Sequence, residues 1–500
     1  MAEDLPRRRV LMLAGASAAG AGLGLGGCST DTDSQQALPA ADVSHGYVSR
    51  PDLTPPAITV TRHGLGRDAG CIFLDAPYSG PGHGGALILD DRGDVVWFGP
   101  STPSEHKLEL NAQTFRGEQV LTWWQGLVKE GYGHGVAVVA DSSYQVRHVI
   151  RAGGGLTADF HELNLTAQGT ALITAYRPHH GVDLTAFGGP ARGVLVSGVA
   201  QEIDIATGRL LFEWDSIDHV PITETHQKPD GGDGGHGTAA SPFNYFHINS
   251  IAVDSDGDLL ISSRNTWTVY KVKRDQAGTI MWRMGGKRSD FTMGPGSRFY
   301  WQHHVRPHPG DVLTVFDNGD APAEEKQSRA LILDVSYQAM HVTLRSAYTH
   351  PGQFLLANAM GSAQWLPGGR MFVGWGTEPY FSEFAPDGRL LLDGAIIKGD
   401  PSYRAFTYDW TGHPADRPAI AARRHNSGAI VYASWNGATE VRTWTVYAGK
   451  NAAALTVVGS ARKNGFETAI AVRNGGPRFA VEARDAEGHP LSRSGTVTIQ

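Results

Sequence analysis

The chain repeats a two-strand pattern along most of its length, and this repeat limits the possible folds more than any other feature. An apolar run, a polar turn with Asp or Gly and a second apolar run recur six times, for example as GALILDDRGDVVWFG and QEIDIATGRLLFEWD. A second strand–turn–strand pattern alternates with the first, for example as FHELNLTAQGTALITAY and FHINSIAVDSDGDLLISSR. Together they give four strands per unit, and a four-stranded unit of about 40–50 residues is typical of a propeller blade. The repeat therefore predicts an all-β fold with a six-bladed β-propeller over residues 56–412.

The sequence changes character near residue 413. From there, IVYASWNGATEVRTWTVYAG and LTVVGSARKNGFETAIAVRNG are series of alternating strands separated by turn residues. This pattern is typical of a small antiparallel sandwich of the immunoglobulin or fibronectin type. We expect residues 413–500 to form such a domain, with a role in packing, spacing or binding rather than in chemistry.

The composition agrees with many short strands joined by tight turns. The 500 residues include 63 glycines, and only 19% are charged, which favours strands and turns over a helical bundle. The net charge of −7 gives no basic surface, so we expect no nucleic-acid partner. The sequence does not indicate an oligomeric state.

The N-terminus has the pattern of an export signal. Arg7 and Arg8 precede a short Ala/Gly/Leu segment that ends in LGGC at Cys28, and this segment is too short and glycine-rich for a membrane-spanning helix. We interpret residues 1–28 as a twin-arginine, lipoprotein-type signal with Cys28 as the lipidated residue; the alternative is a plain signal with a chance cysteine. Residues 29–55 then form a flexible tether, and the protein is exported and held outside the cytoplasm by its lipid anchor alone.

Three histidines occupy the same place in the second pattern. His161, His247 and His303 each stand at the head of a predicted inner strand. In a propeller the first strand of each blade lines the central channel, so these heads should converge near one channel mouth. A lone histidine in this position is more often structural, but three at one phase of a repeat favour a shared site.

The spacing of the histidines does not favour a metal or a cofactor. Only His303 and His304 are close in sequence, and adjacent side chains of a strand point to opposite faces. A G-x-S-x-G nucleophile elbow and a phosphate-binding loop are also missing from the sequence, which argues against a serine hydrolase and a nucleotide site. We expect neither a metal nor a cofactor.

Other polar residues lie near the predicted strand heads. Arginine binds tetrahedral oxyanions through two parallel hydrogen bonds, and histidine acts as acid, base or nucleophile near neutral pH. The alternatives are that the arginines pair with carboxylates and that the DNG sequence is only a turn. The candidates besides the histidines are Asn249, Arg264, Asp317, Asn318 and Arg329.

A longer segment interrupts the repeat before His247. Residues 226–242 read HQKPDGGDGGHGTAASP, a composition that predicts a mobile loop. Such a loop acts either as a lid over the channel or as a solvated insertion, and the sequence does not decide between them.

The motifs in residues 70–400 resemble the bacterial arylsulfate sulfotransferase family. The elements YFHINSI, QHH, FDNGD, SRALILD and GSAQWLPGG follow the family's order and spacing. The resemblance implies an exported six-bladed propeller that moves a sulfuryl group from a phenolic sulfate ester to a phenol, without a nucleotide sulfate donor. It also implies a transiently sulfated histidine, assisted by further histidines and an arginine. His247 and His303 match family histidines that help to bind or protonate the sulfate ester.

The sequence departs from the family at two places. No arginine follows FDNGD until Arg329, and no histidine occurs in residues 351–412, where the family has its nucleophile. His161 and His304 are the candidates for its replacement. Direct transfer between donor and acceptor, and use of the propeller for another purpose, remain open.

The sequence thus predicts an aryl-sulfate sulfotransferase that takes an aryl sulfate donor and a phenolic acceptor. The predicted catalytic residues are His247, His303 and His304. The predicted substrate-binding residues are His161, Asn249, Arg264, Asp317, Asn318 and Arg329. The alternative is a non-catalytic propeller lipoprotein that binds a glycan, an aryl ligand or another envelope protein, and a hydrolase or lyase using the same channel is a third reading.

Overall fold

The protein is built almost entirely of β-strands. The computed structural model describes residues 46–63, 70–77, 84–102, 104–129, 131–396, 400–473 and 476–500. Its one α-helix in these ranges, α1 (Ser216–His219), is four residues long, and 3-10 turns supply the remaining helical residues. No helix in the described part of the chain is long and apolar enough to cross a membrane. The predicted all-β class is confirmed, whereas the predicted signal, Cys28 and most of the tether lie outside the described residues.

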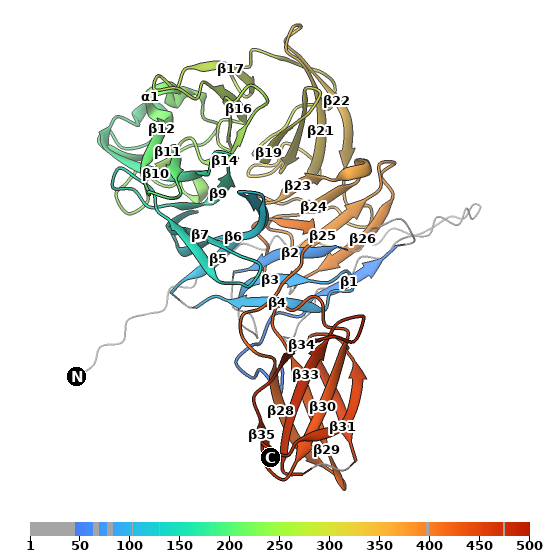
Figure 1. Ribbon diagram of the computed structural model, residues 1–500. Coiled ribbons are helices and arrows are strands. Elements are labelled where there is room, and N and C mark those ends of the chain that lie inside the picture. Colours follow the sequence, from blue (N-terminus) through green and yellow to red (C-terminus); the bar gives the residue numbers. More distant parts are fainter. Residues whose placement is uncertain are drawn as a thin grey trace, which may run out of the picture. The chain divides into compact units, whose positions relative to one another are not determined.

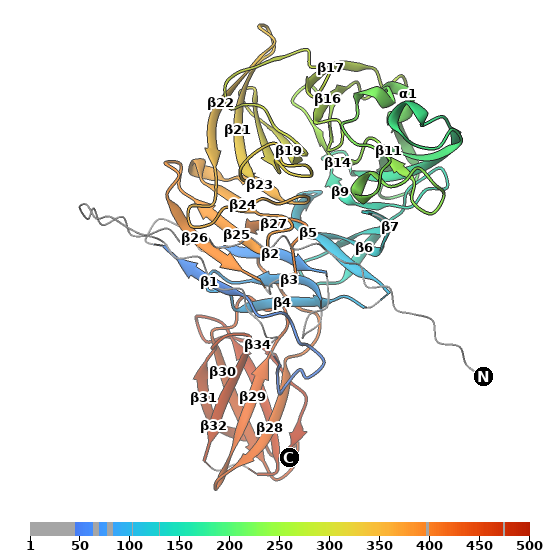
Figure 2. The same ribbon diagram turned by 180° about the vertical axis from the view of Figure 1, so that it is seen from behind.

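Residues 59–408 form successive sheets whose strands are mainly antiparallel, and Figures 1 and 2 show them from opposite sides. Three of these sheets each use strands that follow one another in sequence. The first consists of β5 (His106–Phe115), β6 (Glu118–Lys129), β7 (Tyr132–Ala140) and β8 (Val146–Ile150). The second consists of β9 (Asp159–Leu165), β10 (Thr170–Val182), β11 (Gly193–Asp204) and β12 (Leu210–Asp215), with β13 (Phe243–Asn244) beside β11. The third consists of β14 (Ile248–Val253), β15 (Leu259–Ser263), β16 (Thr268–Val272) and β17 (Ile280–Gly285).

Three further sheets in this range include strands brought from elsewhere in the chain. One consists of β19 (His303–His308), β20 (Val312–Asp317), β21 (Arg329–Ser336) and β22 (His341–Tyr348), with β18 (Thr292–Met293) at its edge. The next consists of β23 (Ser362–Trp365), β24 (Met371–Gly374), β25 (Tyr380–Phe384) and β26 (Leu390–Ala395), to which β1 (Thr59–Arg62) adds. The last joins β27 (Ala405–Tyr408) to β2 (Cys71–Ala76), β3 (Gly85–Leu89) and β4 (Val95–Pro100).

The first strands of these sheets lie next to one another. Strands β5, β9, β14, β19, β23 and β27 are in contact in this order, and β27 in turn contacts β5. The two ends of this part of the chain are also joined, because β1 pairs with β26 and β27 pairs with β2. Neighbouring sheets share their apolar cores: Leu260 of β15 and Val315 of β20 belong to one cluster. Several inner strands are therefore buried on both faces, which explains unbroken apolar runs such as GALIL in β3.

The last part of the chain forms two small sheets. One consists of β28 (Ala419–His425), β29 (Gly428–Ser434) and β32 (Glu467–Val472). The other consists of β30 (Thr443–Gly449), β31 (Thr456–Arg462), β33 (Arg478–Arg484), β34 (Pro490–Arg493) and β35 (Val497–Thr498). Their inward side chains form one apolar cluster, in which Val431 and Val446 come from different sheets.

The end of the predicted tether and the predicted loop both make specific contacts. The backbone N–H groups of Val48 and Ser49 donate to Glu467 at 3.1 and 2.5 Å, and Leu53 is buried. In the segment 226–242, the carbonyl of Gly237 accepts the N–H of Val194 in β11 at 2.8 Å, and the N–H of His226 donates to the carbonyl of Asn265 at 2.8 Å. These residues are thus tied to the fold by hydrogen bonds and burial.

Candidate active site

Three histidine rings meet where the first strands of three neighbouring sheets begin. The ring of His161 lies 4.7 Å from that of His247, and the ring of His247 lies 6.3 Å from that of His303. All three side chains are buried, and His247 is the most exposed at 8%. The expected meeting of His161, His247 and His303 is therefore found in the structure.

Local irregularities in these strands turn the side chains. His247 and His304 have positive φ angles of 52° and 51°, a conformation that non-glycine residues rarely adopt. The pairing register shifts at the same places, between Ile248 and Ser250 and between His303 and Arg306. Such bulges re-aim side chains and occur often beside active sites.

His161 is held by a carboxylate. Its Nδ1 lies 2.6 Å from Oδ2 of Asp159, and the same oxygen accepts the backbone N–H of His161 at 2.9 Å. Thr174 also donates to this oxygen, and Gly133 N–H donates to the other one. With the Nδ1 proton directed to Asp159, Nε2 carries a lone pair, and no described residue hydrogen-bonds to Nε2. This is the arrangement of a base or nucleophile oriented by a carboxylate.

His247 is held in the opposite tautomer. Its backbone N–H donates to Oδ1 of Asn244 at 3.0 Å, which leaves the Asn244 amide NH₂ to donate to Nδ1 at 3.0 Å. The ring proton of a neutral His247 is therefore on Nε2. Burial lowers the pKa of His247 well below its usual range, and the charge of Arg264 adds to the effect. His247 is a neutral hydrogen-bond donor at pH 7.

Both ring nitrogens of His303 are engaged. Nδ1 donates to Oδ1 of Asn318 at 2.7 Å, and Nε2 accepts the backbone N–H of Met360 at 3.3 Å. Asn318 is fixed in turn because its NH₂ donates to the carbonyls of Ala357 and Met360. Burial, followed by the charge of Arg264, lowers the pKa of His303 well below its usual range. His303 is therefore a neutral ring of the cluster whose two nitrogens are both hydrogen-bonded within the protein.

His304 lies away from the three-histidine cluster. Its ring packs 5.3 Å from that of Phe406, and its Nδ1 accepts the N–H of Ala363 at 3.2 Å. Burial lowers its pKa well below the usual range, with Arg306 contributing next. The structure thus places His304 in a core position between neighbouring sheets.

Arg264 is a cation whose charge acts on two rings of the cluster. It is buried, its guanidinium lies 5.0 Å over the Trp301 ring, and it donates to Asn265 at 3.0 Å and to the carbonyl of Asn358 at 2.7 Å. Its charge acts on the pKa of both His247 and His303. It therefore sits close enough to both rings to attract an anion bound there.

The other predicted residues serve mainly to hold the structure. Asn249 donates to the carbonyl of Gln302 at 2.6 Å. Asp317 forms an ion pair with Arg329 and accepts the N–H of Tyr300 at 2.8 Å. Burial raises the pKa of Asp317 to about 6 despite the nearby Arg329. Arg329 therefore pairs with a carboxylate, which was the alternative to its binding an oxyanion.

A buried ionic cluster beneath the histidines was not predicted. Arg404 is fully buried, pairs with Glu109 and lies 3.3 Å from Oε1 of Glu162. Arg306 pairs with Glu162 at 2.8 Å. Arg404 also donates to the carbonyl of His161 at 2.8 Å, so the cluster fixes the strand that carries His161.

The electrostatics of the two carboxylates in this cluster differ. Burial would raise the pKa of Glu162, but Arg306 and Arg404 hold it below its usual range. Burial raises the pKa of Glu109 well above its usual range, although Arg404 opposes this. A signal for both existed in the sequence, because LEL around Glu109 and HEL around Glu162 occupy similar places in the repeat.

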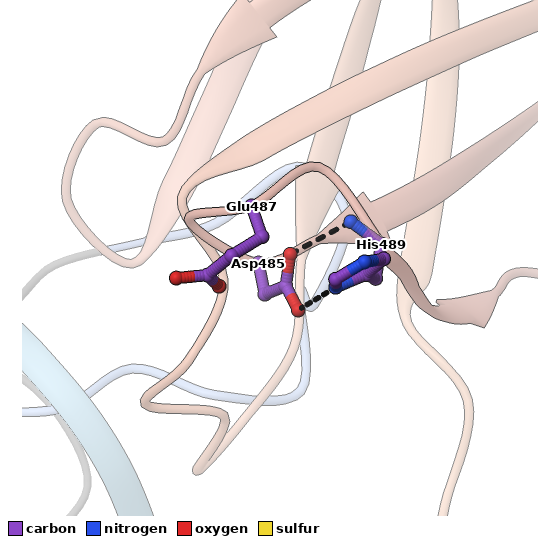
Figure 3. A group of neighbouring side chains, drawn as sticks. All are labelled: Asp485, Glu487 and His489. Carbon is purple, nitrogen blue, oxygen red and sulfur yellow. Dashed lines mark hydrogen bonds and ion pairs between the residues drawn. The ribbon is translucent and has the colours of Figure 1, made fainter.

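One group among the described residues brings three possible metal ligands together, and it is far in sequence from the histidines. Asp485, Glu487 and His489 lie in a turn between β33 and β34 (Figure 3). His489 N–H donates to Asp485 at 2.7 Å, and its Nδ1 lies 3.2 Å from the other oxygen of the same carboxylate. These bonds close the turn, and the mostly exposed side chains give no further indication of an ion.

The buried neutral histidines predict a specific pH dependence of stability. Below pH 6.5 the unfolded chain protonates each histidine, whereas folded His304 stays neutral, so this residue lowers the free energy of unfolding as the pH falls. Asp75 and Asp317, whose pKa values are raised to about 7 and about 6, act in the opposite direction. His304→Gln should therefore remove a loss of about 1.4 kcal/mol per pH unit below pH 6.5.

Urea unfolding of wild type and His304→Gln at pH 5, 6 and 7 measures this difference. The comparison isolates the histidine because both proteins contain the same carboxylates. Parallel pH profiles for the two proteins would contradict the burial of a neutral His304.

A sequence model of the family described as Arylsulfotransferase (ASST) matches residues 111–398. No curated protein matches the chain. Among solved structures, a protein of unknown function from Bacteroides caccae has a TM-score of 0.41 and 11% identity, covering 68% of this chain and 99% of that chain. Virginiamycin B lyase from Staphylococcus aureus has a TM-score of 0.33 and 9% identity, covering 75% of this chain and 95% of that chain. Both likenesses are distant, and neither bears on the reaction.

Proposed function

The chain belongs to the arylsulfotransferase family, and from this membership we propose that it moves a sulfuryl group from a phenolic sulfate ester to a phenol. The family supports a sulfotransferase that acts on small aryl substrates. The observation that carries the finer proposal is the pairing of His161 with Asp159 at 2.6 Å, next to the ring of His247 at 4.7 Å. No nucleotide sulfate donor takes part in the proposed reaction.

His161 is the proposed nucleophile. Its Nε2 lone pair attacks the sulfur of the aryl sulfate, an N–S bond forms, and the S–O bond to the aryl group breaks with its electron pair leaving on the phenolate oxygen. Asp159 stabilises the positive charge that develops on the ring, because its carboxylate accepts a hydrogen bond from Nδ1–H at 2.6 Å. His304, the other candidate, has its Nδ1 occupied by Ala363 and its ring against Phe406.

His247 and Arg264 are the proposed stabilisers of charge. The Nε2–H of neutral His247 donates a hydrogen bond to the departing phenolate oxygen, and the guanidinium of Arg264 attracts the sulfuryl oxygens. A neutral imidazole acts here as a donor because its pKa is lowered by burial. His303 has no free ring nitrogen for this step, since Asn318 and Met360 engage both.

The acceptor phenol completes the proposed cycle. Its oxygen attacks the sulfur, the N–S bond breaks with its electron pair returning to Nε2 of His161, and the acceptor's proton passes to the released phenolate or to solvent. Because the histidine is restored, the cycle needs no cofactor. The non-catalytic alternative predicts that an aryl ligand binds without either step.

We also propose the finer architecture and the location of the protein. The order in which the first strands contact one another, with β27 returning to β5, supports a six-bladed propeller. The shared core of the two C-terminal sheets supports a small sandwich.

The Arg7–Arg8 pair and the LGGC sequence at Cys28 support export and lipid anchoring. Cys28→Ser should then release the protein from the membrane fraction of the producing bacterium, and unchanged retention would contradict the anchor.

The turnover of a chromogenic aryl sulfate by residues 29–500, which lack the predicted signal, tests the proposed reaction. A transferase releases the chromogenic phenol faster when a phenol acceptor is added and forms the sulfated acceptor in equal amount. Release that does not depend on the acceptor would identify a sulfatase. A folded protein that binds aryl sulfates but turns none over would support the non-catalytic alternative.

A further inference from the structure

A separate cavity of about 370 Å³ lies beside the third sheet and the segment that leads into β19. Its wall includes the aromatic side chains of Trp267, Phe291, Phe299 and Tyr300. Small-molecule sites usually have volumes of about 300–1,000 Å³ and largely apolar walls. The cavity is therefore large enough for one substituted aromatic ring.

The aromatic side chains of the wall are arranged around Trp267. Its ring stacks on that of His226, with centroids 3.4 Å apart and planes at 10°. Tyr300 stands almost perpendicular to it, with centroids 5.0 Å apart and planes at 86°. Flat and edge-on aromatic groups in this arrangement favour an aromatic ligand over an aliphatic one.

The charged part of the wall is cationic. Lys287 and Arg298 line the cavity, and none of the described lining residues carries a carboxylate. Lys287 donates to the backbone carbonyls of Thr223 and Thr225, and its ammonium has no carboxylate within 4 Å in the described part of the chain. Glu224 beside it is already paired with Arg283 and Arg288, at 3.4 and 3.5 Å. The wall therefore attracts an anion.

Two buried polar atoms of the wall residues have no hydrogen-bond partner among the described residues. They are Nε1 of Trp267 and Nε2 of His226. Burial, followed by the charge of Lys287, lowers the pKa of His226 to about 4, so its ring is neutral at pH 7. His226 and Trp267 therefore form a neutral aromatic stack in the cavity wall.

We propose that this cavity is a second binding site, and that its ligand is an aromatic anion. The ligand's ring packs against Trp267 and Phe299, and its sulfonate, sulfate or carboxylate group faces Lys287 and Arg298. The site is distinct from the histidine cluster. Trp301 lies between them, 5.1 Å from Trp267 on one side and under Arg264 at 5.0 Å on the other.

This proposal does not depend on sulfuryl transfer, so the probe is an aromatic anion that cannot be transferred. Benzenesulfonate has the ring and the charge, but its sulfur is bonded to carbon. Its affinity is measured by titration calorimetry with wild type, Lys287→Gln and Arg298→Gln. Lys273→Gln is the matched control, because Lys273 is an exposed lysine that lies 3.7 Å from Asp275 outside the cavity.

The loss of one charge-assisted hydrogen bond should raise the dissociation constant about tenfold or more in Lys287→Gln and in Arg298→Gln. Lys273→Gln should bind as wild type does, and His247→Asn should keep the binding event whose affinity falls in Lys287→Gln and Arg298→Gln. Methanesulfonate, which lacks the ring, and benzyl alcohol, which lacks the charge, should each bind at least tenfold more weakly. Wild-type affinity in both cavity variants with a wild-type melting temperature would overturn the proposal, as would a loss of binding confined to His247→Asn.

Discussion

His161→Asn is expected to lower the rate of sulfuryl transfer by about three orders of magnitude or more, because it removes the proposed nucleophile. Asparagine retains a polar side chain of similar size near Asp159, so the buried carboxylate keeps a hydrogen-bond donor. The loss should appear in kcat, since the variant keeps Arg264 and His247 to bind the donor. The measurement is single-turnover release of the chromogenic phenol from the aryl sulfate.

A covalent intermediate gives an independent readout of the same prediction. Wild type mixed with donor in the absence of acceptor should gain the mass of one SO₃ group on the peptide that contains His161. Asp159→Asn should form this intermediate more slowly, by about two to four orders of magnitude, because the ring loses its orienting carboxylate. The label should disappear when a phenol acceptor is added.

Two other histidine variants decide between the candidates. His308→Gln is the matched control, since His308 is a half-buried histidine of β19 that bonds to Thr314 at 2.9 Å, and it should keep wild-type turnover. His304→Gln should also keep most of its activity. Label on His304, or loss of activity in His304→Gln but not in His161→Asn, would refute the assignment.

The repeat allowed the meeting of the histidines to be predicted, whereas their partners required the structure. The heads of the inner strands converge because each four-stranded unit places its first strand in the same position. Residues at the same position of the repeat, such as His161, His247 and His303, are therefore expected to lie close together. The D-x-H spacing of DFH contains the partner of His161, but the contact of Asp159 with Nδ1 depends on the register shift by which Ile173 pairs with Leu163 and Thr174 pairs with Asp159.

The different roles of His303 and His304 could not be predicted from the strand period. Simple alternation places adjacent side chains on opposite faces of a strand. It does not predict which of the two side chains faces the cluster when the strand contains a bulge. The positive φ of His304 and the register shift after His303 depend on packing against neighbouring sheets. The engagement of His303 by Asn318 and Met360 likewise joins segments that lie 15 and 57 residues away.

Arg404→Met is expected to lower the free energy of unfolding by about 3–5 kcal/mol, the usual cost of breaking a buried ion pair from one side. Methionine fills much of the space, so the main loss is electrostatic. Glu109 loses its ion-pair partner, while Glu162 keeps Arg306 at 2.8 Å. Urea unfolding at pH 7 measures the change, and Arg345→Met, which breaks the exposed pair with Asp334, should cost about 0–1 kcal/mol.

The pH dependence separates the loss of charge pairing from a loss of packing. Because Arg404 opposes the effect of burial on Glu109, folded Arg404→Met holds the Glu109 proton at a higher pH than folded wild type does. Its free energy of unfolding should therefore fall less than that of wild type as the pH decreases from 7 toward 5, and the gap between the two should narrow. A difference in the free energy of unfolding that stays constant with pH would show that the loss comes from packing. Adding Glu109→Gln should recover part of the stability at pH 7, because the folded variant then contains no buried carboxyl group that must take up a proton at that pH.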